Sequence, residues 1–162
     1  MRIRPAELSD ADAIMAIYNP VVETSTATFD LVPRTLEDQQ AWLSDRSGAR
    51  IVLVAETDEG EVAGYAALSP YRERAAYATT VEDSVYVADA HHGRGVGRTL
   101  LEELVATARA HGFHAMMARI VADHEASIAL HSACGFQIVG HEREVGRKFG
   151  RWLDVTLMER LL

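Results

Sequence analysis

The segment His91-His92-Gly93-Arg94-Gly95-Val96-Gly97-Arg98 lies between a predicted strand and a predicted helix. Glycines at alternate positions let the backbone approach a ligand closely, and they leave amide N–H groups free to point at it. The first N–H groups of the following helix lack internal partners, and the helix dipole favours an anion. Because Arg94 and Arg98 add positive charge at this end, the segment predicts a phosphate-binding turn.

The turn alone does not identify its phosphate ligand. A P-loop is excluded because the terminal Gly-Lys-Ser/Thr is missing. A dinucleotide fingerprint fits poorly, because the glycine spacing is G-x-G-x-G and no first βαβ unit surrounds it. The alternative without a ligand is a tight turn that simply requires glycines.

A strand is predicted directly before this turn, over residues 81–87. Val81, Val85 and Val87 fall on one face, and Glu82, Ser84 and Tyr86 fall on the other. Asp83 interrupts the apolar face, so we expect a bulge or an exposed strand end there. After the turn, leucines at helical spacing predict a helix over 96–110, which Gly112 ends.

The rest of the chain alternates between strand and helix patterns, which predicts one α/β sheet layered with helices. Ser9 is expected to cap a first helix that Pro20 limits, with a loop over 21–34, and Thr35 a second helix near 36–46. Another helix follows Asp123 or His124 and ends at Gly135. Further strands are expected at 51–55, 61–68, 115–121, 136–140 and 152–158.

Composition narrows the class of protein. The 162 residues suit a single domain, and a net charge of −8 argues against general nucleic-acid binding. No apolar run is long enough for a transmembrane helix, and the N-terminus lacks the features of a signal peptide. Cys134 is the only cysteine, so no internal disulfide forms. These features predict a cytoplasmic protein without a membrane partner.

The stretch from Val85 to Gly97 resembles the acetyl-CoA motif Q/R-x-x-G-x-G/A of the GNAT acetyltransferases, with Gly95 and Gly97 at its later positions and His92 at its first. Further segments resemble the phosphinothricin/methionine sulfoximine N-acetyltransferase branch. They are Glu23-Thr24-Ser25-Thr26-Ala27-Thr28-Phe29, Arg74-Ala75-Ala76-Tyr77, Thr80-Val81-Glu82 and Arg143-Glu144-Val145-Gly146-Arg147-Lys148-Phe149-Gly150-Arg151-Trp152-Leu153-Asp154.

This resemblance implies a single GNAT domain over residues 1–162, with a mixed sheet of about seven strands and about four helices. Two central parallel strands would splay apart, and acetyl-CoA, the co-substrate, would lie in the gap. Its pantetheine would run along Val85, Tyr86 and Val87, and its pyrophosphate would rest on Gly93, Arg94, Gly95, Val96, Gly97 and Arg98. His124, where relatives commonly have Asn, and Ser127 would complete that site. Lys148 to Trp152 would form a hairpin at a homodimer interface.

The chemistry requires a base and an acid. Glu82 is the candidate general base, alone or through a water, and the alternative is a solvated strand carboxylate. His131 stands where many GNAT enzymes have a tyrosine, and it is the candidate acid or relay near neutral pH. The alternative for His131 is a histidine packed in a helix.

The acceptor is expected to be a small amino-acid-like anion of the phosphinothricin, methionine sulfoximine or methionine sulfone type. Arg72 and Arg74 form a fork suited to a carboxylate or phosphinate, with an exposed basic loop as the alternative. The expected acceptor residues are Phe29, Arg72, Arg74, Ala75, Ala76, Tyr77 and Val85. No metal set is expected, since His111 and His114 only flank a glycine. Two other functions stay open: acetylation of another amine or a protein N-terminus, and a non-catalytic acetyl-CoA sensor.

Overall fold

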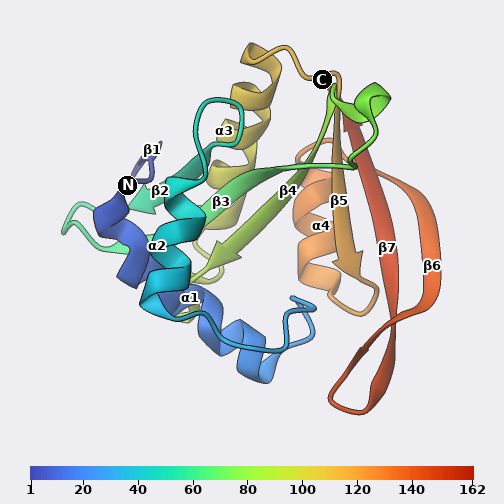
Figure 1. Ribbon diagram of the computed structural model, residues 1–162, viewed down its shortest axis with the longest axis horizontal. Coiled ribbons are helices and arrows are strands. Elements are labelled where there is room, and N and C mark those ends of the chain that lie inside the picture. Colours follow the sequence, from blue (N-terminus) through green and yellow to red (C-terminus); the bar gives the residue numbers. More distant parts are fainter.

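A seven-stranded sheet runs through the molecule in the order β1-β2-β3-β4-β5-β7-β6 (Figure 1). The computed structural model describes all 162 residues. Neighbouring strands are antiparallel except β4 and β5, which are parallel. The sheet is therefore mixed, as expected. Its strands are β1 (Arg2–Pro5), β2 (Val52–Glu56), β3 (Val62–Pro70), β4 (Thr80–Val87), β5 (Ala115–Val121), β6 (Gln137–Lys148) and β7 (Arg151–Leu161).

Four α-helices cover the two faces of the sheet (Figure 1). One face carries α1 (Ala11–Thr24) and α2 (Leu36–Ser44), and the other carries α3 (Val96–Ala110) and α4 (Glu125–Ala133). Three short 3₁₀ turns complete the structure: η1 (Leu8–Asp10), η2 (Ala75–Tyr77) and η3 (Asp89–His91). None of the helices has both the length and the apolar character that a membrane span requires.

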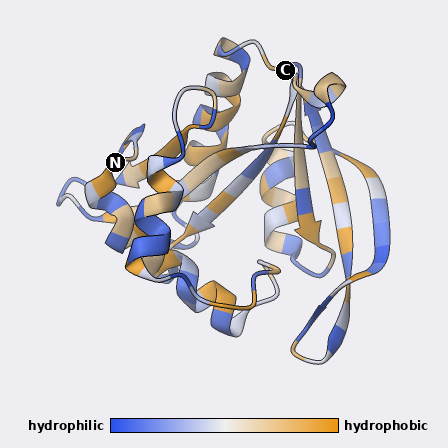
Figure 2. Cartoon of the chain, in the orientation of Figure 1, coloured by the Kyte–Doolittle hydropathy of each residue, from blue (hydrophilic) through white to orange (hydrophobic).

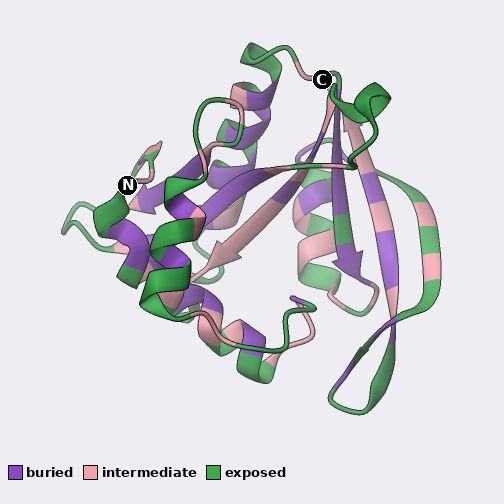
Figure 3. Ribbon diagram, in the orientation of Figure 1, coloured by how far each residue is buried: buried purple, intermediate pink, exposed green.

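Each face of the sheet has its own hydrophobic core. The larger one joins Leu100, Leu101 and Leu104 of α3 to the central strands, and the smaller one joins Ile14 and Tyr18 of α1 to the opposite face. Buried segments accordingly concentrate on β2 to β5, whereas β6 is mostly exposed (Figure 3). The hydropathy of β6 and β7 alternates between polar and apolar residues, as expected for strands covered on one face (Figure 2).

The expectation of a bulge or an exposed end at Asp83 was wrong. The pairing of β4 with β3 is continuous from Val81 to Val87, and Asp83 stands opposite Leu68. Its side chain points to the α3–α4 face and is buried, with 8% of the residue exposed. The carboxylate is tolerated there because it has a polar partner, which the sequence pattern did not show.

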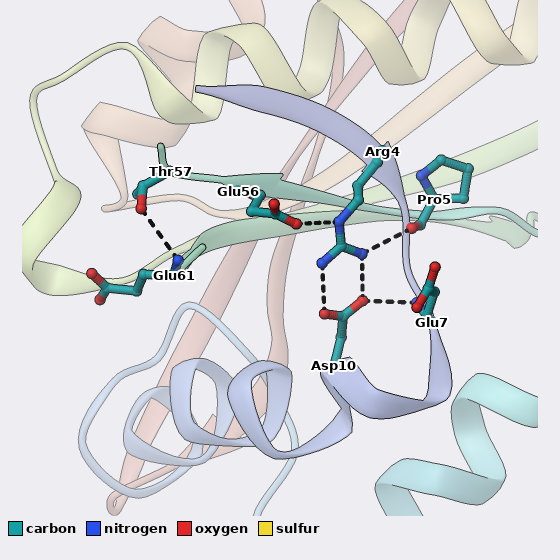
Figure 4. A network of polar contacts seen from close by, with 7 residues as sticks. All are labelled: Arg4, Pro5, Glu7, Asp10, Glu56, Thr57 and Glu61. Carbon is teal, nitrogen blue, oxygen red and sulfur yellow. Dashed lines mark hydrogen bonds and ion pairs between the residues drawn. The ribbon is translucent and has the colours of Figure 1, made fainter. Parts of the chain in front are cut away.

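The start and the end of α1 also differ from expectation. Its first turn is organised by Asp10 rather than Ser9: the Asp10 carboxylate accepts from the Glu7 N–H at 2.8 Å and from Arg4 at 2.7 and 2.9 Å (Figure 4). Arg4 also contacts Glu56, so this network ties α1 to β1 and β2. The Arg4 hydrogen bonds lower the pKa of Asp10.

Pro20 does not limit α1, which continues to Thr24. Proline removes one helical hydrogen bond and crowds the preceding turn. The helix continues because Val22, one turn further on, extends the buried stripe of Ile14, Ile17 and Tyr18. The cost at Pro20 is thus offset by apolar burial on the same face.

The C-terminal strands are longer than the sequence pattern indicated. β6 and β7 form one hairpin, whose turn residues Phe149 and Gly150 both have positive φ, at 52° and 71°. Positive φ at both central residues is the geometry that matches the twist of a tight hairpin. The hairpin expected over Lys148–Trp152 is confirmed, and the arginine-rich stretch before it belongs to β6.

Candidate active site

The parallel strands β4 and β5 separate soon after they meet. They pair at Thr80–Ala115, Val81–Met116 and Glu82–Met117, and nowhere beyond (Figure 1). From there β4 stays with β3 and β5 stays with β7, so one edge of β4 from Asp83 to Val87 has no strand beside it. Backbone N–H and C=O groups inside a protein are normally paired, and this free edge is therefore available to a ligand.

The glycine-rich turn lies at the open end of this gap. Gly93 and Gly95 both have positive φ, at 72° and 81°, and Gly95 is the N-cap of α3 without a side-chain cap. An added Cβ at either glycine would meet no atom within 4 Å. Glycine is thus required at these two positions for the backbone conformation and not for space. This conformation leaves the N-terminus of α3 uncapped, which suits a phosphate.

Gly97 and His92 have different roles in the turn. A Cβ on Gly97 would lie 3.3 Å from Leu130 and 3.5 Å from Val87, so this glycine allows α3 to pack closely on β4 and α4. His92 Nε2 lies 2.9 Å from the Val87 carbonyl oxygen. This hydrogen bond joins the end of β4 to the turn, and it explains how a histidine serves at this position.

His124 and Ser127 lie at the start of α4. The Nδ1 atom of His124 accepts from the backbone N–H of Ser127 at 3.2 Å and caps the helix. The His124 cap expected from the sequence is confirmed. A cavity of about 420 Å³ opens beside it, lined by Thr26, Asp123, His124, Glu125 and Ala126.

Glu82 occupies the point where the two parallel strands part. It forms the last pair with β5, and its half-buried side chain is on the sheet face of α1 and α2. Burial raises the pKa of Glu82, and the charge of Asp83 adds to this, whereas Arg119 and Arg72 act against it. The structure therefore places a carboxylate of raised pKa beside two cations.

His131 projects from α4 into the opposite face of the same strand. Its Nε2 lies 2.8 Å from Asp83 Oδ2, and its Nδ1 lies 2.7 Å from the Ser127 carbonyl oxygen. The ring packs edge-on against Phe136 with centroids 5.0 Å apart. Burial alone would lower the pKa of His131, but the hydrogen bond and charge of Asp83 outweigh it, so the pKa is raised.

The predicted acceptor residues come from three parts of the chain. Arg72 stacks on Tyr71 and Tyr77, with its guanidinium carbon 5.0 and 5.7 Å from the ring centroids, and its charge acts on Glu82. Arg74, Ala75 and Ala76 lie in or next to η2 and are exposed. The structure thus brings Arg72 and Tyr77 together and leaves Arg74 outside that cluster.

Phe29 lies against the C-terminal hairpin. A Cβ added to Gly146 would stand 2.3 Å from the Phe29 ring, so that glycine makes room for it. Beside it, Lys148 is buried and donates to the Thr28 carbonyl oxygen at 2.8 Å. Burial lowers the pKa of Lys148, partly opposed by Asp30. The loop after α1 is therefore held by residues that are 120 positions away in the sequence.

Three features of this site were not predicted from the sequence. They are the charge of Arg119 near Glu82, the contact of Asp83 with His131, and the hydrogen bond from Lys148 to Thr28. Arg119 is the one exposed residue of β5, where it interrupts an otherwise buried strand. A single arginine in an apolar strand could have indicated a functional residue. Nothing local in the sequence connects Asp83 with His131, which is 48 positions away, or Lys148 with Thr28.

Comparisons with known proteins agree with the fold. The family model described as acetyltransferase (GNAT) domain matches residues 3–157. The L-methionine sulfoximine/L-methionine sulfone acetyltransferase of Pseudomonas aeruginosa is 44% identical over 158 residues, which are 97% of this chain and 92% of that protein.

Two solved structures share the whole architecture. A ribosomal-protein-alanine N-acetyltransferase from Brucella melitensis has a TM-score of 0.97 at 43% identity, covering 100% of both chains. A GNAT superfamily phosphinothricin acetyltransferase from Sinorhizobium meliloti, in complex with AcCoA, has a TM-score of 0.95 at 39% identity, covering 99% of this chain and 88% of that chain. Sequence and structure agree over nearly the full length, and this chain therefore belongs to the GNAT family of acetyltransferases.

Proposed function

We propose that this protein transfers an acetyl group from acetyl-CoA to the amine of a small, anionic, amino-acid-like acceptor. The observation that carries the proposal is the half-buried Glu82, which lies where β4 and β5 part, next to the cations Arg72 and Arg119. A base on which two arginine charges act suits a substrate that carries both an ammonium and an acidic group. The names of the Pseudomonas and Sinorhizobium relatives point to such acceptors.

The cofactor side of the gap fits acetyl-CoA, which supplies a thioester that an amine can attack. The N–H groups at the start of α3, exposed by the turn at Gly93 and Gly95, bind the pyrophosphate. Arg94 and Arg98 add charge to that site. The free edge of β4 at Val85, Tyr86 and Val87 hydrogen-bonds the pantetheine, and His124 and Ser127 at the start of α4 complete the contact.

Glu82 acts as the general base. An alkylammonium is not a nucleophile, and the carboxylate, alone or through a water, removes its proton. The raised pKa of Glu82 brings the group closer to neutral pH, where a base is most effective. Activity should therefore fall as the pH drops through the raised pKa of Glu82, because the protonated carboxyl cannot accept a proton.

His131 supplies the proton that the leaving thiolate requires. It projects from α4 and contacts the other face of β4 at Asp83, which is one residue further along the strand than Glu82. Base and acid are thus separated by the strand itself. Phe29, Arg72 and Tyr77 border the acceptor, while Arg74, Ala75 and Ala76 form the loop that closes over it.

The test is release of free thiol from acetyl-CoA with a panel of amines. We expect turnover with methionine sulfoximine, methionine sulfone or phosphinothricin, and we expect Glu82→Gln to lower kcat by about 10²- to 10⁴-fold. Acetyl-CoA affinity should not change. The matched control is Glu103→Gln, which removes an exposed carboxylate from α3. Turnover that survives intact in Glu82→Gln would remove Glu82 from the mechanism.

The panel also includes the other candidate functions. An alanine-ended peptide tests the acceptor class suggested by the name of the Brucella relative. Activity on polyamines alone would contradict the role of Arg72, because the cluster repels a polycation. Tight acetyl-CoA binding without turnover on any amine would favour a sensor.

A homodimer through the C-terminal hairpin is part of the proposal. Val145, Phe149 and Trp152 on this hairpin are large apolar side chains, each more than half exposed. Exposed apolar residues gathered on one element are typical of an interaction surface. Sedimentation velocity measures the mass directly, and a monomer at micromolar concentration would contradict the dimer.

A further inference from the structure

The buried pair of Asp83 and His131 holds a proton at the start of the gap between β4 and β5. Because the Ser127 carbonyl oxygen can only accept, Nδ1 of His131 must carry a hydrogen. Nε2 lies 2.8 Å from Asp83 Oδ2, a distance at which one of the two atoms must carry a hydrogen as well. The two side chains together therefore carry one proton more than a neutral imidazole and a carboxylate would carry.

The position of this pair matters as much as its protonation. Asp83 is the first residue of β4 after its pairing with β5 ends at Glu82. Both side chains are almost fully buried, with 5% of the His131 side chain and 1% of the Asp83 side chain exposed. The second carboxylate oxygen, Oδ1, is also buried and has no hydrogen-bond partner. An unpaired buried oxygen at the start of the gap leaves an acceptor for a donor that the folded chain does not supply.

We propose that Asp83 is a positioning residue, which keeps the proton on His131 and fixes the ring at the start of the gap, so that the Asp83–His131 pair supplies the proton that the thiolate leaving group requires. This inference rests on the proposed acetyl transfer. The Ser127 carbonyl oxygen holds Nδ1 and so opposes a ring flip, and Asp83 stabilises the imidazolium electrostatically where the folded chain leaves little exposure to solvent. Without Asp83, burial would leave a neutral imidazole, which has no proton to give at Nε2.

The proton balance is complete without any further reactant. The Asp83–His131 pair gives its shared proton to the sulfur as the C–S bond breaks with its electron pair on sulfur. The Nε2–Asp83 hydrogen bond opens as the proton leaves, and a neutral imidazole and a carboxylate remain. The acceptor nitrogen loses two protons, which Glu82 passes to water. His131 regains one proton from water, so each turnover releases one proton.

Other charged groups around the pair are more distant. Glu82 projects from the opposite face of β4, and its pKa is raised in part by Asp83. On α4, burial raises the pKa of Cys134, to which Glu102 of α3 and Asp83 add, while Arg98 of α3 and Arg160 of β7 act against it. Asp83 is the only ionisable side chain that contacts the His131 ring.

The first experiment is an NMR titration of the histidines in the protein without ligands. We expect His131 to titrate above pH 6.5 in the wild-type protein and at least about one unit lower in Asp83→Asn, because an opposite charge this close shifts a pKa by about one to three units. The matched control is Asp154→Asn, which breaks the exposed pair with His141 at 2.9 Å. That change should leave the titration of His131 as it is in the wild type, because Asp154 does not contact the His131 ring.

The second experiment is the pH profile of acetyl transfer. In Asp83→Asn the alkaline limb of kcat should move to lower pH and kcat should fall, while KM for the acceptor and Kd for acetyl-CoA stay within about twofold. A merely structural role would lower the amount of folded enzyme and leave the limb in place. If Asp83→Asn does not fold, Asp83→Ser, which removes the charge in a smaller volume, replaces it.

Failure of this inference and failure of the proposed function have different signatures. Wild-type His131 titrating at or below pH 6.5 would overturn the role of Asp83, whatever the activity. An unchanged alkaline limb in Asp83→Asn would do the same and leave acetyl transfer in place. Absence of turnover on every amine would instead contradict the proposed function, while the NMR result would still stand.

Discussion

The two sides of the gap between β4 and β5 are built in opposite ways. The cofactor side consists mainly of consecutive residues, from Val85 through the turn to Arg98. The proposed acceptor side collects Phe29, Arg72, Arg119 and Lys148 from segments that are far apart in the chain. The first side uses backbone conformation and a helix N-terminus, whereas the second uses side chains that only the fold brings together. A local motif can therefore identify the donor of the acetyl group but not its acceptor.

If the two sides are built separately, a change of backbone conformation in the glycine-rich turn should weaken acetyl-CoA binding and leave the acceptor side intact. Gly95→Ala places a side chain at a φ of 81°, which costs about 1–2 kcal/mol in a left-handed conformation. The N-terminal N–H groups of α3 should then turn away from the pyrophosphate. We expect Kd for acetyl-CoA, measured by calorimetry, to rise about tenfold or more, which corresponds to about 1.4 kcal/mol.

Gly60→Ala is the matched control for this change. Gly60 has a φ of 86° in the turn between β2 and β3, and its Cβ would also meet no atom within 4 Å. Both variants should lose a similar free energy of unfolding, yet Gly60→Ala should bind acetyl-CoA as the wild type does. Equal Kd values for the two variants would mean that the turn does not hold the cofactor.

A change on the proposed acceptor side should affect KM for the amine and leave acetyl-CoA binding unchanged. In Gly146→Ala the new methyl group would stand 2.3 Å from the Phe29 ring, and the half-exposed ring has to move. We expect KM for the amine to rise several-fold while Kd for acetyl-CoA stays constant. Gly140→Ala on the same strand, which meets only Leu157 at 3.2 Å, is the control and should leave KM for the amine unchanged. A larger effect on cofactor binding would contradict the separation of the two sides.

The smallest expected effect concerns Arg119, the cation that acts most on Glu82. Its charge lowers the pKa of Glu82 against the larger effect of burial. In Arg119→Gln the pKa of Glu82 should therefore rise, and the acid limb of kcat/KM should move to higher pH by less than about one unit. Arg2→Gln, on the far strand β1, should leave the limb where it is. A shift to lower pH would exclude Arg119 as a partner of the base.

Several elements follow from the sequence because their causes are local. The helix cap at Thr35, the glycine stop at Gly112 and the alternation along β4 each depend on neighbouring residues, and all are confirmed. Gly64, inside β3, is a further local case. The β2–β3 pairing does shift register beside it, and a Cβ there would stand 2.8 Å from the Tyr86 carbonyl oxygen.

Other expectations failed because tertiary contacts outweigh local preference. Pro20 normally ends a helix, but the burial of Val22 carries α1 on to Thr24. The short strands expected near the C-terminus become one long hairpin, because β5 and β7 pair over seven positions and thereby support β6. The sequence pattern predicted a bulge or an exposed end at Asp83, whereas the structure buries this residue against His131.

The sequence by itself determined the glycine-rich turn, the order of strands and helices and the family resemblance, since each of these depends on residues close together in the chain. Three features were decided only by the tertiary structure: the effect of two arginine charges on Glu82, the Asp83–His131 pair and the contact of Lys148 with the loop after α1. The same physical reason explains why the sequence alone could not predict these three features. The pKa of a buried group depends on the charges within a few ångströms, and those charges come from strands and helices that are distant in the sequence.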